Sequence, residues 1–135
     1  MIFLLDTNAC IAAINRRPPQ VRERLRHALE DGDTIAVSTI VLSELWYGAG
    51  LSGRAERNAG LLHAFLAEIE PVPFDEEAAR TAGSIRADLA RKGQTIDAYD
   101  CLIAGHAVRL GAMLVTANAR EFARVRGLAW QNWAE

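Results

Sequence analysis

Short apolar runs and longer segments with helical spacing alternate along this chain of 135 residues. Ile2–Leu5, Thr34–Val37 and Met113–Val115 are almost continuously apolar, which is typical of strands that are buried on both faces of a parallel sheet. Pro71–Phe74 predicts an edge strand because proline cannot donate to a ladder, and Leu128–Trp130 predicts a last strand.

Helical spacing or a capping residue follows most of these runs. The segment 98–110 is apolar nearly all round, so we expect it to be central. The alternation of strands and helices predicts an α/β fold with a mostly parallel sheet of four to five strands and right-handed crossovers. The predicted helices run from caps at Asp6–Asn8 to Asn15, from Pro18–Pro19 to Glu30, from Ser38 or Thr39 to Gly48–Gly53, over Arg54–Glu68, from Asp75 to Arg91, over Ala98–Leu110 and over Arg120–Val125.

Composition narrows the class of protein. The length favours a single domain over residues 1–135, half of the residues are hydrophobic, and no apolar run is long enough to span a bilayer, so we expect a cytoplasmic protein without a membrane partner. The net charge of −2 argues against coating nucleic acid through an overall field. Cys10 and Cys101 lack metal-ligand spacing and are predicted to be buried free thiols.

Three acids interrupt segments that otherwise look buried: Asp6 after the first strand, Glu44 in an apolar helix and Asp100 in the central helix. A carboxylate taken out of water costs several kcal/mol unless a partner compensates it. Few basic residues lie in these segments, so a bound divalent cation is the expected compensation. Each acid alone has the simpler interpretation of a helix cap or an ion pair, but three together favour a site.

Strand ends bring such residues together, because ligands of open parallel sheets bind at the carboxyl ends of the strands. Asp6 and Thr116 follow strands, and all candidate ligands are oxygen donors, which suit Mg²⁺ or Mn²⁺. Carboxylates around Mg²⁺ suit phosphodiester hydrolysis, where the metal polarises the phosphoryl group and activates water. Thr7, Asn8 and Thr116 are predicted to hold ligand geometry or a substrate phosphate.

Four segments in order resemble the motifs of PIN-domain nucleases, and the short chain resembles the VapC toxins of VapBC toxin–antitoxin modules. The segments are Leu5-Asp-Thr-Asn8, Ser43-Glu-Leu45, Tyr99-Asp-Cys-Leu-Ile-Ala104 and Leu114-Val-Thr-Ala-Asn-Ala-Arg-Glu-Phe122. The resemblance covers the whole chain. It implies a three-layer α/β/α fold and a Mg²⁺-dependent endoribonuclease that inhibits translation.

Carried over by position, the resemblance makes Asp6, Glu44 and Asp100 metal ligands. One position departs from it: many PIN domains have an acid two residues after the equivalent of Thr116, and this chain has Asn118. Glu121 lies three residues further on and is a candidate catalytic residue, expected to coordinate the metal directly or through water. Asn118 is expected to position a substrate or a metal-bound water, and the number of metals stays open.

The opening Leu5-Asp-Thr-Asn-Ala-Cys-Ile11 and the closing Val125-Arg-Gly-Leu128 through Asn132-Trp133 are similar to the enteric-type VapC subgroup. Members of this subgroup are associated with cleavage of initiator tRNA. The resemblance further implies a homodimer and a VapB-type antitoxin that blocks the site and carries the operator-DNA binding.

The roles of Arg86 and of the three histidines each have more than one interpretation. Arg86 is expected either to contact RNA or to form an ion pair with Asp88 or another nearby acid. The three histidines, His27, His63 and His106, are expected on the surface or hydrogen-bonded in the core.

Other functions are also compatible with parts of the sequence. Asn118 leaves room for a catalytically silent PIN-like binding or regulatory module. Haloacid-dehalogenase phosphatases use Asp-x-Asp where this chain has Asp6-Thr-Asn8, and receiver domains need a late lysine that is absent after the last strands, so both fit poorly.

Overall fold

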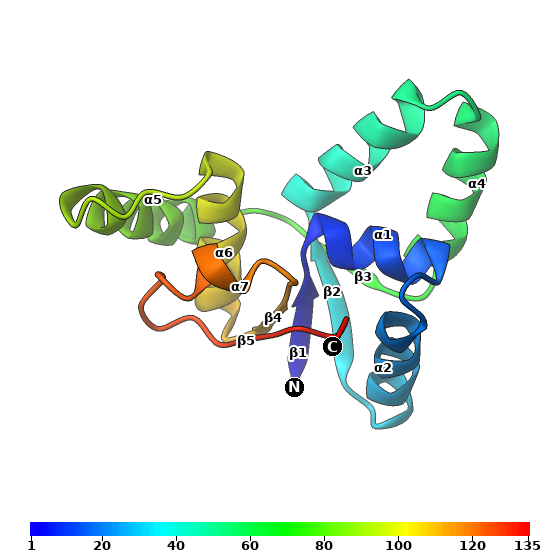
Figure 1. The fold of residues 1–135 in the computed structure, drawn as a ribbon, viewed down its shortest axis with the longest axis horizontal. Coiled ribbons are helices and arrows are strands. Elements are labelled where there is room, and N and C mark those ends of the chain that lie inside the picture. The colour runs from blue at the N-terminus through cyan, green and yellow to red at the C-terminus, as the bar shows by residue number, and fades with distance from the viewer.

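The computed structural model describes all 135 residues, and its centre is a sheet of five strands in the order β3-β2-β1-β4-β5 (Figure 1). Every neighbouring pair of strands is parallel. The sheet is thus wholly parallel, where the sequence predicted a mostly parallel one. The strands are β1 (Ile2–Leu5), β2 (Thr34–Ser38), β3 (Glu70–Val72), β4 (Met113–Val115) and β5 (Trp130–Gln131).

Helices fill the crossovers between the strands. Most begin at a residue whose side chain accepts a first-turn backbone N–H, as Asp6, Ser38, Asp75 and Asp97 do, and α2 begins at a proline instead. The helices are α1 (Thr7–Asn15), α2 (Pro19–Glu30), α3 (Thr39–Leu51), α4 (Ala55–Leu66), α5 (Glu76–Arg91), α6 (Ala98–Leu110) and α7 (Ala119–Phe122).

The direction of the crossovers divides the helices between the two faces of the sheet. The chain moves outward from β1 to β2 to β3 and then crosses back to β4 and β5, so right-handed connections put α1–α4 on one face and α5–α7 on the other. Packing agrees, since α1 contacts α3 and α4 while α5 packs along α6. Figure 1 shows the sheet between these two groups, which confirms the three-layer prediction.

The core follows the predicted apolar runs. Leu4, Leu5, Val37 and Leu114 of the three inner strands are completely buried. Helix α6 buries residues on most of its sides, including Ala104 and Ala107, which confirms its central place. Both cysteines are free and buried, as predicted, and no helix combines the length and apolar content needed to cross a bilayer.

Some predicted element boundaries are wrong by a few residues. The helix predicted over Arg54–Glu68 ends at Leu66, the helix predicted over Arg120–Val125 is Ala119–Phe122, and the last strand is Trp130–Gln131 instead of Leu128–Trp130. The larger errors are at the C-terminal ends, where Ala67 and Ala123 follow the helices in the αR conformation and no left-handed glycine marks the stop.

The fold brings the first and fourth strands together at the point where the strand order reverses. β1 pairs with β4 through Leu5 opposite Val115, and the Asp6 backbone N–H donates to the Val115 carbonyl at 3.1 Å. The residues that follow these two strands therefore lie side by side at the carboxyl edge, which is where parallel sheets bind ligands.

Candidate active site

Asp6 occupies the topological switch point and is only 8% exposed. Its Oδ1 accepts the Ala9 backbone N–H at 2.8 Å, so it is the helix cap that the simpler interpretation predicted. Burial raises the pKa of Asp6, hydrogen bonds from Thr116 and Ala9 oppose that rise, and the negative charge of Glu44 adds to it. Capping α1 therefore does not exclude a place in an acid cluster, because Asp6 also lies within electrostatic range of Glu44.

Glu44 reaches this cluster from α3, on the face of the sheet that carries α1–α4. The Thr7 hydroxyl donates a hydrogen bond to Glu44 Oε1 at 2.8 Å. Thr7 is the residue directly after Asp6, so one turn of chain holds both the cap and the residue that orients Glu44. The prediction that Thr7 holds ligand geometry therefore has a specific contact behind it.

Asp100 enters from the opposite face, in the first turn of α6. Burial, a hydrogen bond with Glu121, and the charges of Glu121, Asp97 and Asp6 together raise the pKa of Asp100 to about 7. Asp97 itself caps α6 by accepting the Tyr99 backbone N–H at 2.9 Å, and its charge still acts on Asp100. Acids from β1, α6 and α7 therefore share one small region.

Asn118 joins two of these acids. Its amide Nδ2 lies 3.2 Å from Glu121 Oε2 and 3.5 Å from Asp100 Oδ2, and its backbone N–H donates to Thr116 Oγ1 at 3.0 Å. The first contact is a hydrogen bond of ordinary length and the second is weak. The amide that departs from the family pattern thus holds Glu121 beside Asp100.

The donor set of this cluster fits a hard divalent cation. Asp6, Glu44, Asp100 and Glu121 supply only oxygen atoms, and none of them takes part in an ion pair of the chain. As the side chains stand, no three of the histidine, cysteine, aspartate and glutamate residues are arranged so that they could hold a metal ion together.

The remaining predicted residues lie at the rim of the cluster. Asn8 is exposed in the first turn of α1, and Arg86 is exposed on α5. The positive charge of Arg86 acts on Cys101, whose pKa is nevertheless raised because burial outweighs it. The alternative of an ion pair from Arg86 to Asp88 is wrong, because Asp88 pairs with Lys92 and Arg91.

One histidine differs from its prediction. His106 is 1% exposed, and its Nδ1 has no hydrogen-bond partner. It packs edge-on against the ring of Phe74. His27 and His63 are exposed, as expected. None of the three joins the acid cluster.

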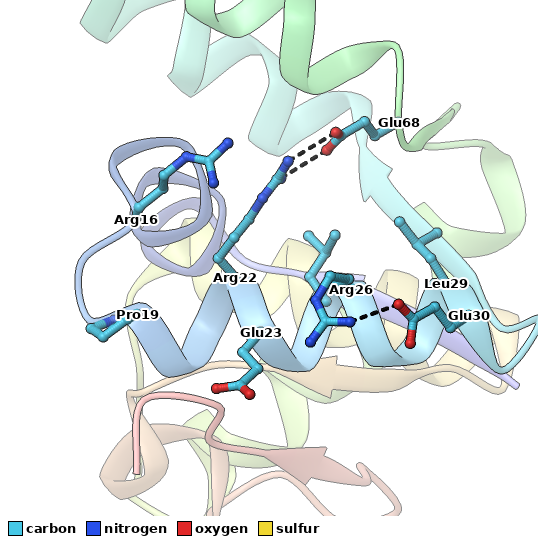
Figure 2. Close-up of a pocket in the computed structure, with 9 residues that line it drawn as sticks. Arg16, Pro19, Arg22, Glu23, Arg26, Leu29, Glu30 and Glu68 are labelled. Carbon is cyan, nitrogen blue, oxygen red and sulfur yellow. Dashed lines mark hydrogen bonds and ion pairs between the residues drawn. The ribbon is translucent and has the colours of Figure 1, made fainter.

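The largest hollow in the surface, about 650 Å³, lies elsewhere, beside α2 (Figure 2). Two of its arginines are already neutralised, Arg22 by Glu68 at 2.7 Å and Arg26 by Glu30 at 2.7 Å. It contains none of the acids described above. Size alone would select this hollow, but four of the six charged residues that line it pair with one another, so we place the chemistry at the acid cluster.

A smaller apolar groove of about 240 Å³ borders Glu44 and was not predicted from the sequence. Its apolar lining comes from three helices, and Ile11 and Leu61 at its edges are 42% and 39% exposed. Helical spacing predicted apolar faces for these helices, but it could not show that the three faces leave a groove between them. The apolar side chains of the groove are Ile11, Ile14, Leu45, Ala49, Leu61 and Leu62.

Comparisons with known proteins agree with this arrangement. The family model for the PIN domain matches residues 3–128. The chain is 43% identical to the tRNA(fMet)-specific endonuclease VapC of Shigella flexneri over 98% of both chains, and 41% identical to ribonuclease VapC2 of Rickettsia felis over 98% of both. It superposes on crystal structures of DNA-bound VapBC2 from Rickettsia felis (TM-score 0.93, 40% identity, 98% and 99% of the two chains) and DNA-bound VapBC from Salmonella typhimurium (TM-score 0.91, 41% identity, 98% of both).

Proposed function

Because the chain belongs to the PIN-domain family and, within it, to the VapC endonucleases, we propose that it is a Mg²⁺-dependent endoribonuclease toxin whose substrate is initiator tRNA. The observation that carries the metal assignment is the raised pKa of Asp100, which reaches about 7 beside Glu121, Asp97 and Asp6, while none of these carboxylates forms an ion pair. A divalent cation, if held there by Asp6, Glu44 and Asp100, would polarise the phosphoryl oxygens and stabilise negative charge on the leaving oxygen.

The side chains divide the work of such a site between them. Asp6, Glu44 and Asp100 hold the cation, and Mn²⁺ can substitute for Mg²⁺ because it takes the same oxygen ligands. Thr7 fixes the carboxylate of Glu44 through its hydroxyl. Such hydrogen bonds orient ligands and are important for metal affinity.

A second group of residues acts on the attacking water and on the RNA substrate. Asn118 keeps Glu121 beside Asp100, where Glu121 takes the proton of the attacking water. Asn8, Thr116 and Arg86 contribute to holding the substrate, with the Thr116 hydroxyl already bonded to the Asn118 backbone.

A VapB-type antitoxin is the partner that we propose for the groove beside Glu44. A groove lined by Ile11, Leu45 and Leu61 fits the apolar face of a short helix, and Glu44 in its lining means that the occupant reaches the acid cluster. With a net charge of −2 the chain is poorly suited to bind operator DNA by itself, so that task belongs to the antitoxin. The functional unit is proposed to be a homodimer.

The proposal is tested by incubating the purified chain with initiator tRNA and, separately, with an elongator tRNA. We expect discrete fragments from the initiator tRNA in Mg²⁺ and none in EDTA. Asp6→Asn and Asp100→Asn should abolish cleavage, whereas Asp88→Asn, a matched change of an exposed acid on α5, should leave it intact. Intact tRNA with the folded parent chain in Mg²⁺ would instead favour a silent binding module, for which Asn118 in place of an acid is the supporting observation.

A further inference from the structure

Tyr99 is an exposed aromatic side chain on the residue directly before Asp100. It lies in the first turn of α6 between Asp97 and Asp100 and is 52% exposed. Apart from Tyr47 on α3, the other aromatic side chains of the chain are buried or half-buried. A large ring left in water beside the reacting acids is available to pack against a substrate.

Arg86 lies next to the same turn of α6 because α5 and α6 pack unusually closely. A Cβ on Gly105 would lie only 2.5 Å from the Ala82 Cα, so the two helices touch backbone to backbone at this point. One turn further along α5, Arg86 comes beside Cys101, whose pKa responds to its charge. Arg86 is exposed and has no ion pair, so its guanidinium group is available to an anion.

Arg120 approaches the cluster from α7. It is exposed, it has no ion pair, and it directly precedes Glu121. The Arg124 guanidinium donates to the Thr95 carbonyl at 3.0 Å, which ties the end of α7 to the loop before α6. Two unpaired arginines, one from α5 and one from α7, therefore lie around the first turn of α6.

The acid cluster is negatively charged, so an RNA backbone needs nearby cations in order to bind here. Asp6, Asp97, Asp100 and Glu121 act on one another electrostatically, and a phosphate chain approaching them is repelled. The other side of the cluster, beyond Glu44, is the apolar groove and offers no basic lining. The α5–α7 side is thus the side on which an RNA backbone finds both cations and an aromatic ring.

We propose that a single unpaired nucleotide of the substrate stacks its base on Tyr99, while Arg86 and Arg120 hold the phosphates on its two sides. This inference rests on the proposed function and assigns side chains to it: Tyr99 for an unpaired base, and Arg86 and Arg120 for the phosphates beside that base. A base inside a duplex is already stacked on its neighbours, so duplex RNA cannot use the ring.

Binding can be measured without cleavage in an Asp6→Asn background. The probe is an RNA hairpin with an unpaired loop, and the same sequence annealed to its complement is the duplex control. We expect Tyr99→Ala to weaken hairpin binding roughly 5–150-fold, the usual effect of removing one stacking ring, and Tyr99→Phe to retain it. Duplex binding should be weak and should not respond to either change.

The arginines are tested by the salt dependence of the same binding. Arg86→Gln and Arg120→Gln should each reduce the slope of log affinity against log salt by about 0.7, the value for one phosphate contact on a single strand. Arg109→Gln is the matched control, because Arg109 is an exposed arginine without an ion pair at the other end of α6. Its slope should equal that of the parent.

The outcomes separate this inference from the proposed function. If the parent chain cuts initiator tRNA and Tyr99→Ala binds the hairpin as well as the parent does, the inference fails and the function stands. Equal losses of hairpin binding in Tyr99→Phe and Tyr99→Ala would assign the contribution of Tyr99 to its hydroxyl group and not to its ring. That result would also overturn the inference. A changed sedimentation coefficient for Tyr99→Ala would assign the ring to an interface between copies, with the same consequence.

Discussion

Replacing Gly105 by alanine should force α5 and α6 apart and destabilise the protein. The added Cβ would lie 2.5 Å from the Ala82 Cα and 2.6 Å from both its N and Cβ, all of them atoms that no side-chain rotation can move. Carbon atoms in contact prefer about 3.5–4.0 Å, so the helices must separate by about 1 Å. Overpacking of this kind costs about 1–3 kcal/mol.

Gly83→Ala is the matched control, since Gly83 lies on α5 itself and a Cβ added to it would meet no atom within 4 Å. It should stabilise the chain by about 0.5–1 kcal/mol because alanine is the better helix former. At roughly 4 °C per kcal/mol for this length, thermal unfolding followed by circular dichroism should give a Tm about 4–12 °C lower for Gly105→Ala and about 2–4 °C higher for Gly83→Ala. A Gly105→Ala variant with the Tm of the parent would refute the close packing that places Arg86 beside α6.

Three further predictions concern the site and the core. Thr7→Val removes the donor to Glu44 Oε1, so cleavage rates at limiting Mg²⁺ should fall about 10–100-fold while the Tm changes little. Burial and neighbouring acids raise the pKa of Asp100 from 3.8 to about 7, so the stability that its protonation contributes is present below pH 4 and lost as pH rises through 7. Metal-free Tm should fall over that range, and Asp100→Asn should flatten the fall; an unchanged profile would contradict the assignment. Burial lowers the pKa of His106, so its neutral form contributes stability above about pH 6.5 that is lost as pH falls. His106→Leu should therefore remove part of the acid destabilisation seen in urea unfolding, and a steeper loss in acid would contradict this.

The sequence predicted the fold because local and tertiary signals agree in it. The apolar run Ile2–Leu5 is buried between two parallel neighbours, and the acids at 6, 75 and 97 each cap the helix that follows them. The C-terminal ends of α4 and α7 were misplaced, because each is followed by an alanine in the αR conformation and not by a left-handed glycine cap. A boundary without a cap is set by tertiary packing, which the local pattern does not contain.

The convergence of the acids was predictable, whereas their contacts were not. Apolar surroundings mark Asp6, Glu44 and Asp100 in the sequence, and the strand order brings them to one edge of the sheet. The hydrogen bond from Thr7 to Glu44 joins residues 37 positions apart and depends on how α1 and α3 pack. The groove beside Glu44 was missed for the same reason, because an apolar stripe looks alike whether a neighbouring helix covers it or not.

Asn118 shows why a departure from a family pattern need not remove a function. An aspartate at this position would add a further negative charge to a cluster that already raises the pKa of Asp100 to about 7. The amide instead donates toward Glu121 Oε2 at 3.2 Å and Asp100 Oδ2 at 3.5 Å, which offsets part of the repulsion between these two carboxylates. We propose that Glu121, three residues later and hydrogen-bonded to the Asn118 amide at 3.2 Å, supplies the acid that the pattern expects at 118. The substitution therefore changes how the acids are arranged before a cation binds, while an oxygen donor set of the same chemical kind is retained.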